Sequence, residues 1–119
     1  DSAQFQLLPD LSVRPTEAIF DKIAMSVFVG TPLEMALRDC GLEAFAIVGV
    51  AMEIGIEPTV RHGIDLGFLP VVVTDACGAG NPEAAERSLA TLRFAGGSLE
   101  TQTATICSTL ASSRAPRDR

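Results

Sequence analysis

The sequence predicts an α/β protein, in the form of a three-layer α/β/α sandwich with a parallel, Rossmann-like sheet. Two observations carry this prediction. Short apolar runs at residues 44–50 and 69–73 are typical of strands that are buried on both faces. Segments with helical start and stop signals separate the runs, and strands that alternate with helices form parallel sheets with right-handed crossovers.

Four segments have the pattern of strands, at residues 18–20, 44–50, 69–73 and 98–106. The first is short, and the two central runs are continuous and apolar. The last alternates weakly between apolar and polar residues, which suits the edge of a sheet. The predicted order along the chain is therefore β-α-β-α-β-α-β.

Three helices are predicted between these strands. The first begins with Thr31 as its N-cap and stops at Gly41, because glycine tolerates the left-handed conformation of a helix end. The second covers residues 52–66, and it either begins near Glu57 or bends there, because a proline follows. The third begins with Asn81 as its N-cap and runs to about residue 94.

The chain of 119 residues has the length of about one domain. We predict that residues 1–110 form this domain, with residues 1–18 as an extended lead-in that prolines and polar residues interrupt. Residues 111–119 are predicted to be a disordered tail.

The composition excludes several classes of function. A formal net charge of −6 makes nucleic acid and anionic membranes unsuitable partners. The apolar stretches near residues 44–52 and 68–73 are much shorter than the roughly 18–20 residues that cross a bilayer. Three cysteines without a CxxC spacing and a single histidine disfavour a disulfide framework and a metal site. The cysteines are interpreted as small buried residues. We expect the protein to be soluble and cytoplasmic.

Lys22 and the turn over residues 49–56 form the candidate site, because ligands of open parallel sheets bind beyond the carboxyl ends of the strands. Lys22 follows the first predicted strand, where its ammonium can stabilise negative charge; an ordinary surface lysine is the alternative. Unpaired backbone N–H groups are expected at the turn, which contains Ala51, Met52 and Glu53, and they suit a carboxylate or an oxyanion. A tight turn also needs glycine for steric reasons.

The Cys-Gly-Ala-Gly stretch at residues 77–80 resembles a phosphate-binding loop only superficially. No Lys-Ser or Lys-Thr pair follows it, and no GxGxxG is completed. We interpret it as a flexible connection, and an unrelated nucleotide-binding domain is disfavoured for the same reason.

Several stretches, taken in order, resemble the isochorismatase-like hydrolase superfamily, also called the cysteine hydrolases. The segment that starts Lys22-x-x-x-Ser26-Val27-Phe28 and continues Gly-Thr-x-Leu to residue 33 is similar to the family's K-x-x-x-S-A-F-x-G-T-x-L. Further similar segments are LRDCGL at 37–42, AIVGV at 46–50, I-x-x-T at 56–59 and G-F-x-P-V-V-V-x-D-A at 67–76. The resemblance covers roughly residues 8–106.

The resemblance implies a catalytic set of aspartate, lysine and cysteine. Lys22 matches the lysine, whereas Gly55 stands where the family's nucleophilic cysteine belongs. Cys40 lies in a different segment and does not replace it. The family's aspartate belongs to a first strand that precedes the part of the fold this chain resembles, which is the C-terminal portion. Lys22 and Gly55 are therefore the candidate catalytic positions.

Gly55 shifts the expected chemistry away from covalent catalysis. Family members that cleave amides form an acyl-enzyme with a thiolate, whereas members that hydrolyse the vinyl ether of isochorismate need no covalent nucleophile and also carry glycine here. The resemblance thus implies non-covalent hydrolysis of a small carboxylated metabolite, with an aspartate from a segment outside this chain. The alternatives are a non-catalytic relative, acting as a ligand-binding or assembly subunit, and an amide (C–N) hydrolase.

The substrate-binding residues expected on this basis are Phe28, Ala51, Met52, Glu53 and Thr59. Glu53 can act as an acid or orient water, although a solvated glutamate at a helix start is the commoner case. No cofactor and no metal are expected. The resemblance also implies a homo-oligomer, or a companion chain that carries the N-terminal strands, because an incomplete sheet exposes a strand edge.

Overall fold

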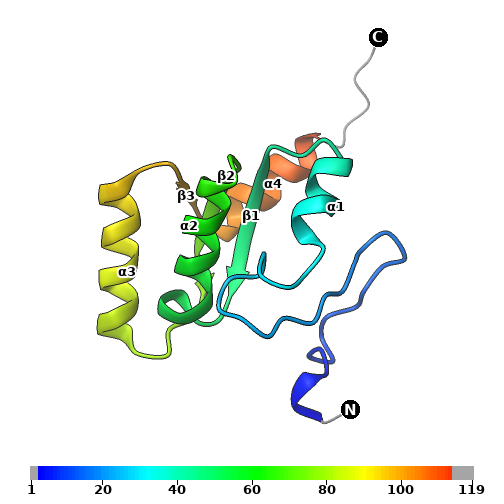
Figure 1. Cartoon of the computed structure of the whole chain (residues 1–119), viewed down its shortest axis with the longest axis horizontal. Coiled ribbons are helices and arrows are strands. Elements are labelled where there is room, and N and C mark those ends of the chain that lie inside the picture. The colour runs from blue at the N-terminus through cyan, green and yellow to red at the C-terminus, as the bar shows by residue number, and fades with distance from the viewer. Residues whose placement is uncertain (1–2, 114–119) are drawn as a thin grey trace.

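The computed structural model describes residues 3–113, in which helices and parallel strands alternate from residue 33 onward (Figure 1). The elements in chain order are η1 (Ala3–Phe5), α1 (Leu33–Asp39), β1 (Ala44–Gly49), η2 (Met52–Ile56), α2 (Glu57–Asp65), β2 (Leu69–Cys77), α3 (Pro82–Ala95), β3 (Leu99–Thr101) and α4 (Thr103–Ser113). The turn η2 is a π-helix that continues directly into α2.

The sheet is parallel throughout, and its strands lie in the order β1-β2-β3. Ala44 pairs with Leu69 at the start of β1, and Val71 pairs with Leu99 where β3 joins. Helices α2 and α3 lie on one face of the sheet and α4 lies behind it in Figure 1, and both α2 and α4 contact β2. The predicted three-layer α/β/α arrangement with a parallel sheet is confirmed.

The hydrophobic core lies between the sheet and helices α2 and α3. Val60 of α2 and Val72 of β2 have no exposed surface. The buried cluster consists of Met52, Ile56, Val60, Val72, Ala85 and Leu92. Because η2 contributes two of these side chains, the turn that follows β1 is anchored in the core.

The opposite face of β1 is apolar and exposed. Successive side chains of a strand point to opposite faces, so that Phe45 and Ile47 are half-buried while Ala44, Ala46 and Val48 are exposed. Val48 keeps 58% of its surface accessible. Strands of parallel sheets are normally covered on both faces, so this face of β1 is suited to association.

Three of the predicted strands differ from the structure. The strand predicted at residues 69–73 continues to Cys77. Residues 18–20 form no strand, because the described sheet contains only β1, β2 and β3 and offers them no pairing partner. Of residues 98–106, only Leu99–Thr101 pair with β2. The helix α4 then begins at Thr103, whose backbone N–H donates to Asp75 Oδ1 at 2.8 Å.

The predicted tail also begins too early. Helix α4 continues to Ser113, past the predicted domain boundary at residue 110. The remainder of the predicted tail, residues 114–119, lies outside the described residues.

The helix starts and stops agree with the sequence in most cases. Asn81 is the N-cap of α3 and its side chain accepts from the Ala84 N–H at 2.9 Å, while α2 begins at Glu57 as predicted. Gly41 ends the first helical segment with a φ of +66°. Thr31 is not the N-cap of α1, because its hydroxyl donates to the Val27 carbonyl and the helix starts one residue later than predicted.

Asn81→Ala is expected to lower the free energy of unfolding by about 1 kcal/mol, the usual contribution of an N-cap side chain. The substitution leaves the Ala84 N–H without its acceptor. Urea denaturation of the two proteins measures the difference, with Asn81→Ser as the control that keeps a capping oxygen. Equal losses in both variants would contradict the assignment of the cap.

Candidate active site

A cavity of about 230 Å³ lies at the carboxyl end of β1, which is the edge where parallel α/β sheets bind their ligands. Lys22 and Thr59 are its polar residues. The remaining lining residues are Val27, Ile47, Val48, Gly49, Val50, Gly55 and Ile56. One cation among apolar walls suits a small ligand with an anionic group and an apolar body.

Lys22 and Gly55 lie next to each other at this cavity. A Cβ atom on Gly55 would lie 3.9 Å from Lys22 Nζ and 3.6 Å from the carbonyl oxygen of Met25. Both distances are ordinary van der Waals contacts, so the site has room for a side chain that Gly55 does not supply. Lys22 Nζ itself donates to the carbonyl oxygens of Ala24, at 2.7 Å, and Met25, at 3.2 Å. An ammonium carries three donors, and one therefore remains for a ligand beyond these two bonds.

The backbone N–H groups of the turn after β1 are largely occupied within the turn. The turn begins with a cis Val50–Ala51 peptide bond and continues into η2. The carbonyl oxygen of Ala51 accepts three of the N–H groups at 2.9–3.1 Å, those of Ile54, Gly55 and Ile56. The expectation that unpaired N–H groups here bind a carboxylate is therefore wrong for these residues, because the tight helical turn closes its own hydrogen bonds.

Gly78 connects this turn to the end of β2. Its carbonyl oxygen accepts from the Met52 N–H at 2.8 Å, and its own N–H donates to the Gly49 carbonyl at 2.9 Å. A Cβ atom on Gly78 would come within 2.2 Å of Val50 Cγ1, so the absence of a side chain at position 78 makes room for the Val50 side chain. The stretch over residues 77–80 is thus packed against the site and is not a loose connection.

Glu53 connects the turn to the N-terminus of α3. One of its carboxylate oxygens accepts from the Asn81 N–H, and the other is buried without a hydrogen-bond partner among the described residues. The backbone N–H groups of Glu53, Asn81 and Gly80 lower the pKa of this carboxyl below its ordinary value, although burial opposes them. A carboxyl that stays ionised is a poor general acid, so the geometry favours a structural role for Glu53.

The Glu53 interaction is expected to make stability depend on pH in the acid range. Because the folded-state pKa is lowered, the contribution is complete above the ordinary value of 4.5 and is lost as the pH falls through the lowered value. Glu53→Gln is expected to show a smaller loss of stability between about pH 6 and about pH 3 than the parent chain. Urea midpoints across this range measure it, and Glu43→Gln, which removes the same charge at an exposed position, is the control. An unchanged acid profile in Glu53→Gln would contradict the interpretation.

The other expected substrate-binding residues lie in different environments. Thr59 lines the cavity but is 2% exposed, and its Oγ1 accepts from the Val27 N–H at 3.1 Å. Phe28 and Met52 are buried in the core and are not among the lining residues. Ala51 serves the turn through its carbonyl oxygen. The structure therefore brings Lys22, Gly55 and Thr59 together, and leaves Phe28 and Met52 as packing residues.

Three lining residues were not predicted from the sequence, namely Val27, Ile47 and Val48. Their position was the only signal, since Val27 lies within the lysine motif and the other two lie near the end of a predicted strand. In the sequence, an apolar residue at a strand end has the same pattern whether its side chain packs in the core or lines a cavity.

The cysteines differ from the buried setting that was expected. Cys40, the C-cap of α1, and Cys107, in α4, are exposed, and neither helix has a fully buried side chain among the described residues. Cys77 is partly buried, and its Sγ donates to the Ile47 carbonyl at 3.8 Å. Burial raises the pKa of the Cys77 thiol and so lowers its thiolate fraction. None of the three lines the cavity beside Lys22.

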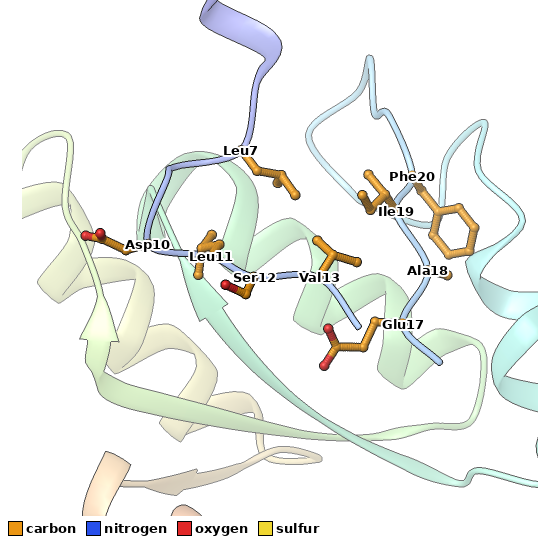
Figure 2. A pocket seen from close by; sticks show the side chains of 9 residues that line it. All are labelled: Leu7, Asp10, Leu11, Ser12, Val13, Glu17, Ala18, Ile19 and Phe20. Carbon is orange, nitrogen blue, oxygen red and sulfur yellow. The ribbon is translucent and has the colours of Figure 1, made fainter. Parts of the chain in front are cut away.

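A larger concavity, of about 720 Å³, is a separate feature. It is lined by residues between Leu7 and Phe20, and Figure 2 shows that all of the labelled side chains come from this N-terminal segment. No strand end or helix terminus contributes to it. Ligands of parallel sheets bind at the carboxyl ends of the strands, and we therefore place the candidate site at the smaller cavity that contains Lys22.

Within residues 3–113, no helix has the length and apolar character needed to cross a membrane. The same residues contain no group of three or more His, Cys, Asp or Glu side chains arranged to hold a metal ion.

Known proteins resemble this chain over most of its length. It is 34% identical to the uncharacterised isochorismatase family protein YwoC of Bacillus subtilis over 79% of this chain and 47% of that protein. The crystal structure of an isochorismatase family protein from Desulfovibrio vulgaris is similar with a TM-score of 0.75 and 30% identity, over 85% of this chain and 53% of the other. The nicotinamidase/pyrazinamidase PncA of Bacillus subtilis matches with a TM-score of 0.65 and 27% identity, over 68% and 44% of the two chains.

The chain thus spans about half the length of these relatives. The model of the isochorismatase domain matches residues 1–109. A match of this extent, joined to the same fold in solved relatives of that name, means that the chain belongs to the isochorismatase family.

Proposed function

We propose that this chain supplies the lysine side of an active site that hydrolyses the vinyl ether of a small carboxylated metabolite without a covalent intermediate. The observation that carries the proposal is the environment of Gly55. The position beside Lys22 Nζ has room for a side chain and holds no nucleophile. That space is available to the substrate or to attacking water.

The proposed reaction needs an acid and water. A proton added to the terminal CH2 carbon of an enolpyruvyl ether forms a methyl group and leaves an oxocarbenium ion. Water adds to this cation and loses a proton, and the resulting hemiketal breaks its C–O bond to release pyruvate and an alcohol. The proton gained and the proton lost balance, so the net change is the addition of one water. No cofactor takes part.

Lys22 binds the carboxylate of the substrate in this proposal. It is the one cation among the described residues that line the cavity, and two of its donors are already fixed by Ala24 and Met25. Hydrogen bonds to charged groups are stronger than neutral ones. The apolar walls formed by valine and isoleucine side chains accommodate the rest of the molecule.

The acid comes from a segment outside this chain in this proposal. Glu53 is held ionised, and no carboxylate is among the described residues that line the cavity. The family resemblance assigns the role to an aspartate on an N-terminal strand, and the chain spans about half the length of its relatives. A positioned general acid contributes roughly 10²–10⁴-fold to the rate, so the chain by itself is expected to be a poor catalyst.

Amide hydrolysis is the second candidate, because the relative from Bacillus subtilis with a TM-score of 0.65 is a nicotinamidase/pyrazinamidase. That chemistry calls for an activated nucleophile. Glycine at position 55 and the location of the three cysteines away from the cavity make this the weaker candidate for this chain.

We also propose a cytoplasmic location, which the three free cysteines support.

The test compares two probes on the chain itself. Isochorismate and nicotinamide are titrated into ¹⁵N-labelled protein, and the amide signals of Lys22, Val50 and Gly55 report binding at the cavity. Turnover is followed as pyruvate from isochorismate and ammonia from nicotinamide. Imidazolium buffer replaces the missing acid, and it does not compete for Lys22 because it is a cation.

We expect isochorismate to shift these three signals and pyruvate release to rise with the imidazolium concentration above the protein-free rate. Release of ammonia from nicotinamide would overturn the proposal in favour of amide hydrolysis. Binding of isochorismate with no pyruvate at any buffer concentration would overturn it in favour of a non-catalytic, ligand-binding relative.

A further inference from the structure

Lys22 belongs to a turn whose position is set by side chains of α2. The Val27 N–H donates to Thr59 Oγ1 at 3.1 Å, and Ser26 Oγ is hydrogen-bonded to His62 Nδ1 at 2.9 Å. The ammonium of Lys22 is in turn bonded to carbonyl oxygens of the same turn. The side chain of Lys22 is therefore linked to α2 by hydrogen bonds through the short segment from residue 22 to residue 27.

These contacts are shielded from water. Thr59 is 2% exposed and Ser26 is 8% exposed. The ring of Phe28 packs edge-on against the His62 ring with the centroids 5.4 Å apart, and it stacks on Phe68 on another side. Buried donors that lose their acceptor are costly, so the hydrogen bonds strongly favour this one placement of the turn.

The same helical segment carries the other half of the candidate site. Gly55 lies in η2, which continues without a break into α2, and Thr59 and His62 follow on α2. Residues three apart lie on the same face of a helix, so Thr59 and His62 hold the turn side by side. A change in the hydrogen bonds from Thr59 and His62 to residues 26–27 would move the lysine relative to position 55.

We propose that Thr59, Ser26 and His62 are positioning residues. Their hydrogen bonds set the distance between the Lys22 ammonium and position 55. The inference rests on the proposed function only in taking Lys22 as the group that binds the ligand. Thr59 acts in this account through the Val27 backbone, although it was expected from the sequence to bind substrate. His62, one helical turn further along α2, has the same role through its hydrogen bond with Ser26.

A thiol introduced by Gly55→Cys provides a measure of the lysine's position that needs no substrate. A Cβ atom at this position lies 3.9 Å from Lys22 Nζ, and a nearby ammonium lowers the pKa of a thiol and raises its reactivity. The rate of alkylation by iodoacetamide is read for each cysteine-containing peptide by mass spectrometry. Cys40 and Cys107 are exposed and serve as internal standards, and partly buried Cys77 reports any loss of folding.

In the Gly55→Cys background, Lys22→Met is expected to slow alkylation of the introduced thiol by about tenfold. Thr59→Val and His62→Leu, which keep size but remove the hydrogen bonds, are expected to slow it by about threefold or more. Thr59→Ser and His62→Asn keep a polar atom close to the original one and are expected to restore the rate to within about twofold. The rates at Cys40, Cys77 and Cys107 stay unchanged throughout.

The proposal is overturned if Thr59→Val and His62→Leu leave the rate of the introduced thiol at the parent value while Lys22→Met lowers it. It is equally overturned if Lys22→Met has no effect, because the lysine would then not act at position 55. If alkylation of Cys77 rises in Thr59→Val or His62→Leu, that variant is partly unfolded. The rate measured for Thr59→Ser or His62→Asn at the same position then tests the proposal. Since no substrate is used, a failed hydrolysis assay leaves this result interpretable.

Discussion

Lys22→Met is expected to weaken the binding of isochorismate to this chain by roughly 10- to 150-fold, because a hydrogen bond to a charged group contributes about 1.5–3 kcal/mol. Lys22 is the cation of the cavity, and the backbone N–H groups of the adjoining turn that could replace it are bonded to Ala51. Titration followed by NMR gives the dissociation constants of both proteins.

Arg87→Met is the matched control, because it removes the same charge from an exposed pair with Glu83 on α3. It is expected to leave the affinity unchanged, which separates a local contact from the general effect of net charge. If the two substitutions weakened binding equally, Lys22 would be an ordinary surface residue.

We expect the isolated chain to associate through the exposed face of β1. Ala44, Ala46 and Val48 form this apolar face, and covering apolar surface contributes about 25 cal/mol per Å². A few hundred Å² would therefore contribute several kcal/mol, which is comparable with the stability of a whole small domain. Light scattering is expected to give at least twice the monomer mass of 12.5 kDa.

Ala46→Lys tests the face that is involved. A charge at the centre of an apolar interface is expected to raise the dissociation constant by at least about 100-fold and to give a monomer. Ala90→Lys adds the same charge at an exposed position of α3 and is expected to leave the assembly unchanged. A monodisperse monomer formed by the parent chain would refute the expectation outright.

Much of the fold could be predicted from the sequence because local signals and tertiary packing agree there. The runs that became β1 and β2 are apolar and short, and Asn81 and Gly41 carry strong local preferences for the ends of helices. Residues 18–20 and 102–106 were misassigned because their sequence is ambiguous. A strand needs a partner, and residues 18–20 have none in the described sheet. Thr103 begins a helix because Asp75, distant in sequence, accepts its N–H.

The site was predictable only in part. Lys22 and Gly55 were identified through motifs, and the structure places them 3.9 Å apart when a Cβ is added to the glycine. The hydrogen bonding of the turn was not predictable, because a π-helical turn that closes three N–H groups onto Ala51 leaves no pattern in the residue types. The role of His62 depends on a contact with Ser26 across 36 positions of sequence, which no local signal reports.

The contact between Glu53 and the start of α3 has a consequence for how this sequence can change over generations. A Cβ atom on Gly80 would meet Glu53 Oε1 at 2.7 Å, so a larger residue at position 80 would displace the carboxylate that accepts from the Asn81 N–H. Replacing Glu53 first opens the space, but it removes the anion that binds this helix start. A larger residue at position 80 and the hydrogen bond from Asn81 to Glu53 are therefore incompatible in the present geometry, whichever position changes first. Descendants of this sequence are expected to keep Gly80 for as long as they keep Glu53.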